Sequence, residues 1–438
     1  FESEAEDVFA SGTPSHVPSS SFHMMHCTIC DFESHSNSEH NQHVHSSIHQ
    51  HNLLLLNIVL EKMRTLLKQY KEALYSLSAP KSGHVVSLPT FGEFIQHENN
   101  VSGNALEGES QQRDCYLSHC LKQWYTSKRP CKFVKRRRKL LICFARELLR
   151  TCVILDSGSN FEEVKSSLLA SSPDLNNHKP VEDDTQLALY GSVALELDTD
   201  SSDIDLSANV SRKTLLWIHS TMRHLKSPLI KCELCLSART PLVTFHDTLY
   251  HLQLDLAQSM SDKLFNCRMI QECLTREPNL RYLVFGVKSF AKKAGINCSF
   301  SGTVNSYGWT VLLFAYLQSK EILPLLVGET MAFEQSLFDH TPQISDARLG
   351  ELFRGFFQHF SQFSFHENRV SLRQKGGSTE KEAHKFADNA VLTIERPFEA
   401  YSNNARQVTE KTLRVIHRKF HEMVTKLTSL SDGDRAPL

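Results

Sequence analysis

Three aspartates in strand-like surroundings most constrain how this chain folds. The run Leu187–Ser192 ends an apolar segment with Gly-Ser, ten residues follow, and Asp203-Ile-Asp205-Leu comes next. A third acid, Asp255, interrupts the apolar run Leu252–Leu256. Residues two apart on a strand project from the same face, so Asp203 and Asp205 form a carboxylate pair. Because an ionised carboxylate among apolar neighbours is costly to bury alone, the fold must bring these acids to an edge or to a cation.

The residue types around this acid pair indicate a metal centre that handles phosphate. Mg²⁺ prefers carboxylate oxygens together with substrate phosphates, and Mn²⁺ is an alternative to it here. A strand that ends in Gly191-Ser192 lets the backbone turn tightly and presents amides to a phosphate. The structural alternative is an Asp- and Ser-rich turn, because Asp198 and Asp200 precede the pair. The combination of turn, pair and third acid favours a Mg²⁺ site held by Asp203, Asp205 and Asp255 beside a bound phosphate.

The hydrophobic pattern predicts an α/β (α+β) domain followed by a mostly helical one. We assign residues 156–275 to the catalytic domain, with strands at 186–190, 203–208, 230–237, 241–246 and 250–256 and helices at 212–226 and 262–275. We assign residues 276–430 to the helical domain, with helices at 280–294, 306–319, 346–362 and 404–429 and a short strand at Val391–Glu395.

The N-terminal third is more irregular. Residues 1–22 are polar, which predicts disorder. Residues 53–155 contain helices at Leu53–Ser76 and Leu140–Leu155, and residues 79–112 between them lack periodicity, which predicts a disordered insertion. Arg129–Lys139 (RPCKFVKRRRK) is basic, and its last part, Lys135–Lys139, is interpreted as an RNA contact, a nuclear signal or a solvated helix start.

A His-rich block at residues 23–52 predicts a small C2H2-type zinc finger. Cys27 and Cys30 are followed after twelve residues by His43 and after five more by His49. Four such ligands suit tetrahedral Zn²⁺, with His40, His45 or His51 as possible substitutes. A second Cys-x-x-Cys, Cys232 and Cys235, lies in a strand-like run, and we interpret both as core residues whose side chains point to opposite faces.

Longer motifs add a family resemblance to this picture. The pattern of apolar-Gly-Ser, Asp-x-Asp and a strand acid resembles the DNA polymerase β nucleotidyltransferase superfamily. Three further segments narrow this resemblance to part of the superfamily. They lie at 287–308 (VKSFAKKAGIN followed by GTVNSYG), 352–357 (LFRGFF) and 394–406 (IERPFEAYSNNAR). They resemble the central and PAP-associated domains of cytoplasmic-type poly(A) polymerases and terminal uridylyltransferases, over roughly residues 130–430.

The resemblance implies a template-independent RNA 3′-terminal nucleotidyltransferase, with a polymerase-β-like domain beside a helical PAP-associated domain and the active site in the cleft between them. It also implies that the helices before the catalytic sheet return to the helical domain, so Leu53–Ser76 or Leu140–Leu155 is expected to pack there. Similar fingers precede the transferase domain in some relatives, where they bind structured RNA or a protein adaptor. The nucleotide-binding residues that it implies, in addition to the three aspartates, are Gly191, Ser192, Asn266, Lys288, Lys292, Ser306, Tyr307 and Ser402.

The nucleotide recognition motif at 394–406 departs from the family pattern. Many uridylyltransferases carry a histidine where Ser402 stands here, and an acid where Arg396 stands. If the alignment shifts by one residue, the histidine position falls on Tyr401 or Asn403 instead. Ser402 leaves more room for a purine, whereas the finger favours the uridylyltransferases. We therefore expect UTP as the substrate, with ATP as the alternative. A degenerate transferase that serves as an RNA- or protein-binding module is the competing hypothesis, and the presence of all three acids argues against it.

Composition limits the binding partners and the cellular compartment that can be expected. The formal net charge is -1, so RNA binding must depend on local basic patches. No apolar stretch of about 18 residues occurs, so no membrane partner is expected. Scattered cysteines indicate a reducing compartment, which suggests the cytoplasm, with the nucleus as the alternative. The chain starts at Phe1 and not at a methionine, which predicts that it is a fragment of a longer protein.

Overall fold

The structure is a computed structural model. It describes residues 25–27, 29–30, 32–77, 87–102, 108–157, 160–170, 187–238, 240–258, 261–325, 343–382 and 390–437. The predicted disordered segment 1–22 lies outside these ranges.

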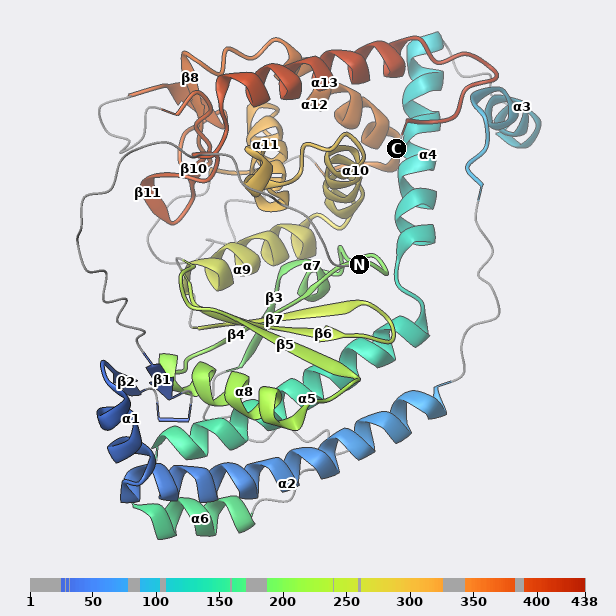
Figure 1. Ribbon diagram of the computed structural model, residues 1–438. Helices are drawn as coiled ribbons and strands as arrows, with labels where there is room; N and C mark the ends of the chain where they lie inside the picture. Colours follow the sequence, from blue (N-terminus) through green and yellow to red (C-terminus); the bar gives the residue numbers. More distant parts are fainter. Residues whose placement is uncertain are drawn as a thin grey trace, which may run out of the picture.

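A five-stranded mixed sheet forms the centre of the catalytic half (Figure 1). Its strands, in spatial order, are β3 (Ala188–Tyr190), β4 (Ile204–Ala208), β7 (Leu252–Gln258), β6 (Leu242–Asp247) and β5 (Ile230–Cys235). The neighbours β4 and β7 run parallel, and the other neighbouring strands run antiparallel. In β7, the leucines at 252, 254 and 256 are buried in one core, so Asp255 between them faces the opposite side of the sheet. The predicted mixed α/β class is confirmed, and each predicted strand boundary in this sheet is correct to within two residues.

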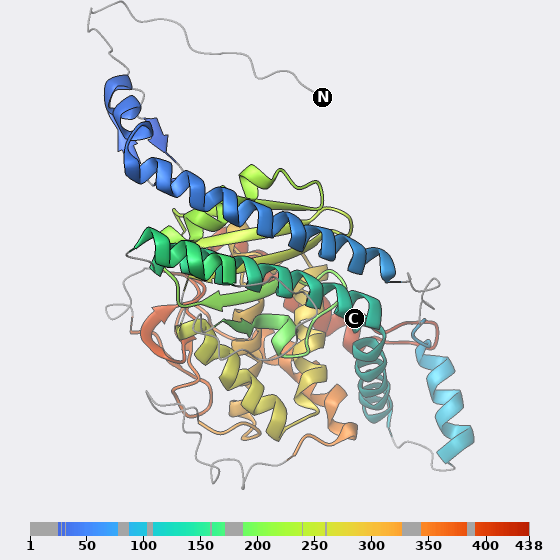
Figure 2. The same cartoon turned by 90° about the horizontal axis from the view of Figure 1, so that it is seen from below.

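One face of the sheet is covered by a layer of long helices, seen from below in Figure 2. The layer contains α2 (Ser47–Ser76), α5 (Lys132–Ser157), α6 (Phe161–Ala170) and α8 (Arg212–Leu225). Their apolar faces and the buried face of the sheet form one continuous core, which includes Tyr70, Phe144, Trp217 and Phe245. A sheet that is apolar on one face needs such a cover, and the amphipathic helices provide it.

The second half of the molecule is helical and has its own core. It contains α10 (Leu280–Lys293), α11 (Ser306–Ser319), α12 (Leu349–Ser361) and α13 (Glu410–Thr428). Short hairpins, β8 (Asn368–Val370) with β9 (Ser378–Glu380) and β10 (Glu395–Arg396) with β11 (Glu399–Asn403), flank these helices. The helix α9 (Ser261–Arg276) lies between the sheet and this bundle (Figure 1).

Two expectations about the N-terminal helices were wrong. Residues 79–112 are not an unstructured insertion throughout, because α3 (Phe91–Ser102) lies within them and α4 (Glu109–Lys128) begins there. Phe91 and Phe94 contact the ring of Tyr116, so tertiary contacts stabilise a helix that local periodicity did not reveal. The parts 78–86 and 103–107 lie outside the described residues.

The second error concerns which helices return to the bundle. Both α2 and α5 pack in the core of the catalytic sheet, whereas α3 and α4 pack in the core of the bundle. The sheet face had to be covered, and the two longest amphipathic helices cover it.

Smaller differences occur in the C-terminal half. The predicted helix 404–429 begins at Glu410, because Thr409 caps it and residues 404–407 form a turn. The predicted strand Val391–Glu395 is reduced to a bridge between Ile394 and Val370, followed by β10. Among the described residues, no helix is long and apolar enough to cross a membrane.

Candidate active site and metal centre

The sheet brings the three predicted acids together. Asp205 lies directly opposite Asp255 in the parallel pairing of β4 and β7, and opposite Tyr190 in the antiparallel pairing of β3 and β4. Asp203 stands immediately before β4, two residues from Asp205. The carboxylates of the two central strands therefore face the same side of the sheet, toward α9 and the bundle.

The electrostatics of these acids indicate a site that favours cations. Burial, and next the carboxylate of Asp255, raise the pKa of Asp205 to about 6. The same two causes raise the pKa of Asp203. Lys263 and Lys288 oppose the shift at Asp205 without cancelling it. The protein's own cations therefore leave negative charge uncompensated, which fits a divalent cation with oxygen ligands.

We predict that Asp205→Asn stabilises the metal-free protein at neutral pH. Because the folded state binds the Asp205 proton more tightly than the unfolded chain, this carboxyl group favours unfolding once it ionises. The penalty is absent below the ordinary pKa of 3.8, grows up to a pH of about 6 and is complete above it. Partial solvent screening reduces the effect to about 1 kcal/mol, or about 2–4 °C in Tm.

The measurement is thermal unfolding in chelating buffer at pH 7.5 and at pH 4. The variant should melt higher than wild type at pH 7.5 and equally at pH 4. An equal Tm at both pH values would contradict the electrostatic strain inferred for Asp205.

The Gly191-Ser192 turn packs directly against this acid centre. Gly191 has φ 72. A Cβ atom at that position would lie 2.1 Å from Asp205 Oδ2. Only glycine satisfies both the left-handed backbone and the close approach to the carboxylate. The turn also starts α7 (Gly191–Ala194), and the Ser192 hydroxyl accepts a hydrogen bond from Lys288 Nζ at 3.1 Å.

Lys288 and Lys292 reach the catalytic domain from α10, which belongs to the bundle. Lys292 Nζ donates to Ser201 Oγ at 3.3 Å. Burial lowers the pKa of Lys288 to about 8, and Asp205 opposes that shift. Both lysines thus stand one helical turn apart and point across the interface toward the acids, as a clamp for anionic oxygens requires.

Three further predicted residues lie on α9 and at the start of α11. Tyr307 Oη donates to Asn266 Oδ1 at 2.6 Å, which joins the start of α11 to α9. Ser306, the first residue of α11, exchanges hydrogen bonds with Asn297. Tyr307 and Asn266 are therefore in direct contact, and Ser306 is adjacent to Tyr307 at the start of α11.

Ser402 lies on β11 of a hairpin that leans on α9. The ring of Phe398, in the turn of that hairpin, lies 6.1 Å from the ring of Phe265 on α9. Arg396 Nη1 donates to Glu399 Oε2 at 2.7 Å, and its charge acts on both Tyr307 and Lys263. The arginine at the position of the family's acid therefore lies close enough to influence Tyr307 and Lys263.

Lys263 lies close to the acids but was not predicted as a site residue. Burial lowers the pKa of this lysine, whereas Asp205 and Asp255 raise it. Its Nζ also lies 3.5 Å from Tyr190 Oη. Its position three residues before Asn266, on the same face of a helix, was the available signal.

The basic run at residues 129–139 is only partly available to RNA. Arg137 and Arg138 are buried in ion pairs with Asp247 and Asp198. Their assignment as RNA contacts was therefore wrong. Lys135, Arg136 and Lys139 are exposed.

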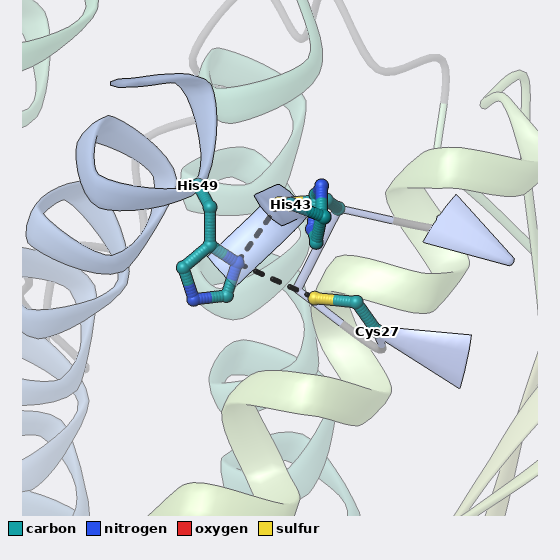
Figure 3. Close-up of side chains that lie close together, drawn as sticks. Cys27, His43 and His49 are labelled. Atoms are coloured by element: carbon teal, nitrogen blue, oxygen red, sulfur yellow. Dashed lines mark hydrogen bonds between the residues drawn. The ribbon is translucent and has the colours of Figure 1, made fainter. Parts of the chain in front are cut away.

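The predicted finger ligands converge at the outer end of α2. The finger consists of β1 (Met25–Cys27), β2 (Phe32–Ser34), α1 (Asn37–Val44) and the first turn of α2. Figure 3 shows the side chains of Cys27, His43 and His49 turned toward one another. With Cys30, their ligand atoms all lie within 4.8 Å of one another. The Sγ atoms of both cysteines lie 3.5 Å from His49 Nδ1.

These distances fit a tetrahedral metal ion. Zn–S bonds of about 2.3 Å and Zn–N bonds of about 2.1 Å place tetrahedral ligands roughly 3.3–3.8 Å apart. His43 Nε2 is buried and has no hydrogen-bond partner, as expected of an atom reserved for a metal. His40, His45 and His51 are not part of the cluster found among the described residues.

The finger is built into the catalytic domain. Ile29, between the two cysteines, packs against the core of the sheet domain. Asn52 Nδ2 donates to Cys30 Sγ at 3.3 Å, and the ring of His51 stacks on Phe161 of α6. Figure 2 shows the finger at one end of α2, whose remaining length lies along the sheet domain.

The second Cys-x-x-Cys lies on β5. Cys232 is partly buried against the core, but Cys235 is exposed, so the assignment of Cys235 to the core was wrong. Neither residue belongs to a metal-ligating group among the described residues.

Comparison with known families supports the resemblance seen in the sequence. Residues 173–273 match the family described as "Poly(A) RNA polymerase, mitochondrial-like, central palm domain". Residues 348–401 match the family described as "Cid1 family poly A polymerase". The resemblance to poly(A) polymerases and terminal uridylyltransferases is thereby confirmed for both halves.

Individual relatives include enzymes of both kinds. The chain is 27% identical over 197 residues to the mitochondrial poly(A) RNA polymerase of Mus musculus. This match covers 41% of this chain and 33% of that enzyme. It is 24% identical over 291 residues to the terminal uridylyltransferase cid1 of Schizosaccharomyces pombe, covering 58% of this chain and 71% of cid1. The match spans about a third of the length of the mitochondrial enzymes.

Solved structures share the fold. A cytoplasmic RNA terminal U-transferase superposes with a TM-score of 0.58 at 22% identity, over 73% of this chain and 96% of that one. Cid1 in complex with its short product ApU gives the same TM-score of 0.58 over the same shares of the two chains. The fold is therefore that of Cid1, a polymerase-β-like domain beside a PAP-associated domain.

Proposed function

We propose that this protein adds nucleotides, with uridine preferred, to RNA 3′ ends without a template. The observation that carries the proposal is the convergence of three carboxylates, on or next to the parallel strands β4 and β7, with Ser192 of the Gly-Ser turn and two lysines of the facing bundle. Gly191, Ser192, Lys288 and Lys292 supply the groups that a triphosphate needs, opposite Asp203, Asp205 and Asp255. Relatives of this chain include poly(A) polymerases and terminal uridylyltransferases, which supports the same interpretation.

The chemistry assigned to the chain's own residues is positioning and charge stabilisation. Lys288, Lys292 and Ser306 bind the triphosphate oxygens, Asn266 binds the ribose and Tyr307 stacks on the base. The RNA 3′-hydroxyl oxygen attacks the α-phosphorus, and the bond to pyrophosphate breaks. Asp255 receives the hydroxyl proton. Two Mg²⁺ ions, for which Asp203, Asp205 and Asp255 are the ligands, supply charge stabilisation for the attacking and leaving oxygens.

The proposed preference for UTP rests on the side chain of Arg396. Arg396 offers only hydrogen-bond donors, which suit the carbonyl oxygens of uracil and disfavour the amino group of adenine. The structural match to Cid1, whose structures include a complex with a UTP analogue, points the same way. ATP remains the second candidate, because poly(A) polymerases match the chain over similar lengths.

We propose Zn²⁺ as the metal of Cys27, Cys30, His43 and His49, on the basis of the ligand set and its spacing. The finger would bind structured RNA or an adaptor protein. The free thiols among the described residues suit a reducing compartment, so we propose the cytoplasm, with the nucleus as the alternative.

The decisive test is extension of a labelled single-stranded RNA with Mg²⁺ and each nucleoside triphosphate separately. Extension with UTP supports the proposal, and longer products with ATP than with UTP overturn the uridine preference. Failure with all four nucleotides would leave the chain as a binding module with a transferase fold.

Ser402→His is expected to shift the preference further toward UTP. An added imidazole donor can bind a uracil oxygen, and a hydrogen bond worth about 1.4 kcal/mol corresponds to a tenfold change in the ratio of kcat/KM for UTP over ATP. The neighbouring Tyr401→His provides the comparison, because Tyr401 is the adjacent residue of β11 and is exposed. A ratio that is unchanged in the first variant, or changed equally in both, removes position 402 from base selection.

A further inference from the structure

A short loop connects the Gly191-Ser192 turn to the first catalytic acid. We call residues 198–202 the acidic loop. It follows the buried Leu197 and ends directly before Asp203. Ser201 in this loop accepts the hydrogen bond from Lys292, and Thr199 N donates to Ser202 Oγ at 2.9 Å. The conformation of the acidic loop therefore sets where Asp203 and Lys292 meet the substrate space.

One buried arginine of α5 holds most of this loop. The side chain of Arg138 is only 3% exposed. Its Nη1 donates to the Asp198 carboxylate, and its Nη2 points at three main-chain carbonyls of the loop. The distances to the carbonyl oxygens of Thr199, Ser202 and Asp200 are 2.5, 2.9 and 3.3 Å. A planar guanidinium can satisfy such a set, whereas a lysine ammonium cannot span it.

The same loop is also tied to the helical bundle. Arg129, just after α4, donates to the other oxygen of the Asp198 carboxylate. Tyr125 on α4 donates to the carbonyl oxygen of Glu196 at 2.9 Å. Because α4 packs in the core of the bundle and α5 in the core of the sheet domain, Asp198 joins one arginine from each side.

We propose that Arg138 is a positioning residue that presets Asp203 for binding of the metal–nucleotide complex. It acts through the acidic loop and touches neither substrate nor metal. The inference rests on the proposed function for its kinetic consequence, although its effect on metal binding can be measured without any turnover. Groups that orient metal ligands from behind typically change metal affinity or activity by about 10- to 100-fold when they are replaced.

The test compares Arg138→Lys with Arg137→Lys. Arg137 is the adjacent residue on α5, is 5% exposed, and pairs with Asp247, the last residue of β6, which is not part of the acidic loop. Both variants replace a buried guanidinium with an ammonium, so both should lower Tm to a similar extent. Two readouts are needed: Mn²⁺ binding to the nucleotide-free protein by electron paramagnetic resonance, and kcat, KM for UTP and the Mg²⁺ requirement in RNA extension.

Arg138→Lys should weaken Mn²⁺ binding about tenfold and lower kcat by about 10- to 100-fold, with little change in KM for UTP. Arg137→Lys should leave Mn²⁺ binding unchanged. Equal Mn²⁺ affinities in the two variants overturn the inference. If wild type extends no RNA, the proposed function fails, but the Mn²⁺ comparison still decides the role of Arg138.

A second pair keeps the inference testable if Arg138→Lys does not fold. Asp198→Asn keeps the shape of the side chain but removes the charge that Arg129 and Arg138 share. Asp247→Asn is the control, because it removes the charge that pairs with Arg137. Weaker Mn²⁺ binding in Asp198→Asn alone supports the inference, and equal binding in both overturns it.

Discussion

Replacing Asp203 and Asp205 together by alanine is expected to abolish RNA extension. Asp205 faces Asp255 across the β4–β7 pair, and Asp203 precedes that pair, so the double variant leaves one carboxylate of three. Loss of the cation ligands removes several kcal/mol of charge stabilisation in the transition state. A loss of about 4 kcal/mol corresponds to roughly a 1,000-fold lower rate.

The control is Asp200→Asn, an exposed acid of the same turn. The backbone carbonyl that Arg138 binds is kept in this variant, so activity should stay within about threefold, the scatter expected of a surface change. Rates are measured from single-turnover extension of labelled RNA at saturating UTP. Extension by the double variant at more than a tenth of the wild-type rate would remove these aspartates from the chemistry. Thermal unfolding of the double variant checks that a loss of activity does not come from a loss of folding.

Short-range patterns predicted the catalytic core well. Strand periodicity gave the sheet, and strand alternation explains why Asp203 and Asp205 share a face. The register that sets Asp205 against Asp255 was not predictable from spacing, because fifty residues and two strands separate them. Similarly, the positions of Lys288 and Lys292 on one helix were predictable, but their partners Ser192 and Ser201 depend on how the bundle meets the sheet.

Tertiary context explains the errors. The basic run suggested a solvated or RNA-bound surface, yet Arg138 turns inward because the carbonyls of residues 199–202 and the Asp198 carboxylate offer it a full set of acceptors. The partition of helices also failed from sequence. The periodicity of α2 and α5 predicts an apolar face on each helix, but it does not say which of the two cores that face covers.

Removal of the finger metal should produce the largest local change in stability. Binding of Zn²⁺ to small fingers contributes apparent free energies of roughly 10–16 kcal/mol, and most of their folding depends on it. We expect one zinc per chain by elemental analysis. In hydrogen exchange with a strong chelator, protection should be lost in β1, β2, α1 and the first turn of α2, where His49 lies.

The rest of α2 should stay protected, because from Leu55 onward it is buried against the sheet domain. Tyr70 near its other end donates to the buried Asp247 carboxylate, which holds that half of the helix independently of the metal. The boundary of lost protection is therefore expected between His49 and Leu55. Loss that extends into β4 and β7 would contradict this boundary and make the finger and the sheet one cooperative unit.

Variants separate the metal from side effects of the chelator. Cys27→Ser with Cys30→Ser should lose the zinc and reproduce the exchange pattern of the chelated protein. Cys131→Ser with Cys235→Ser removes two exposed thiols elsewhere and should keep both the zinc and the protection. Because Ile29 packs against the sheet domain and lies between the two ligating cysteines, the metal-free finger also exposes an apolar side chain that the domain normally covers. An increase in binding of a hydrophobic dye in the first double variant, and none in the second, is the expected consequence.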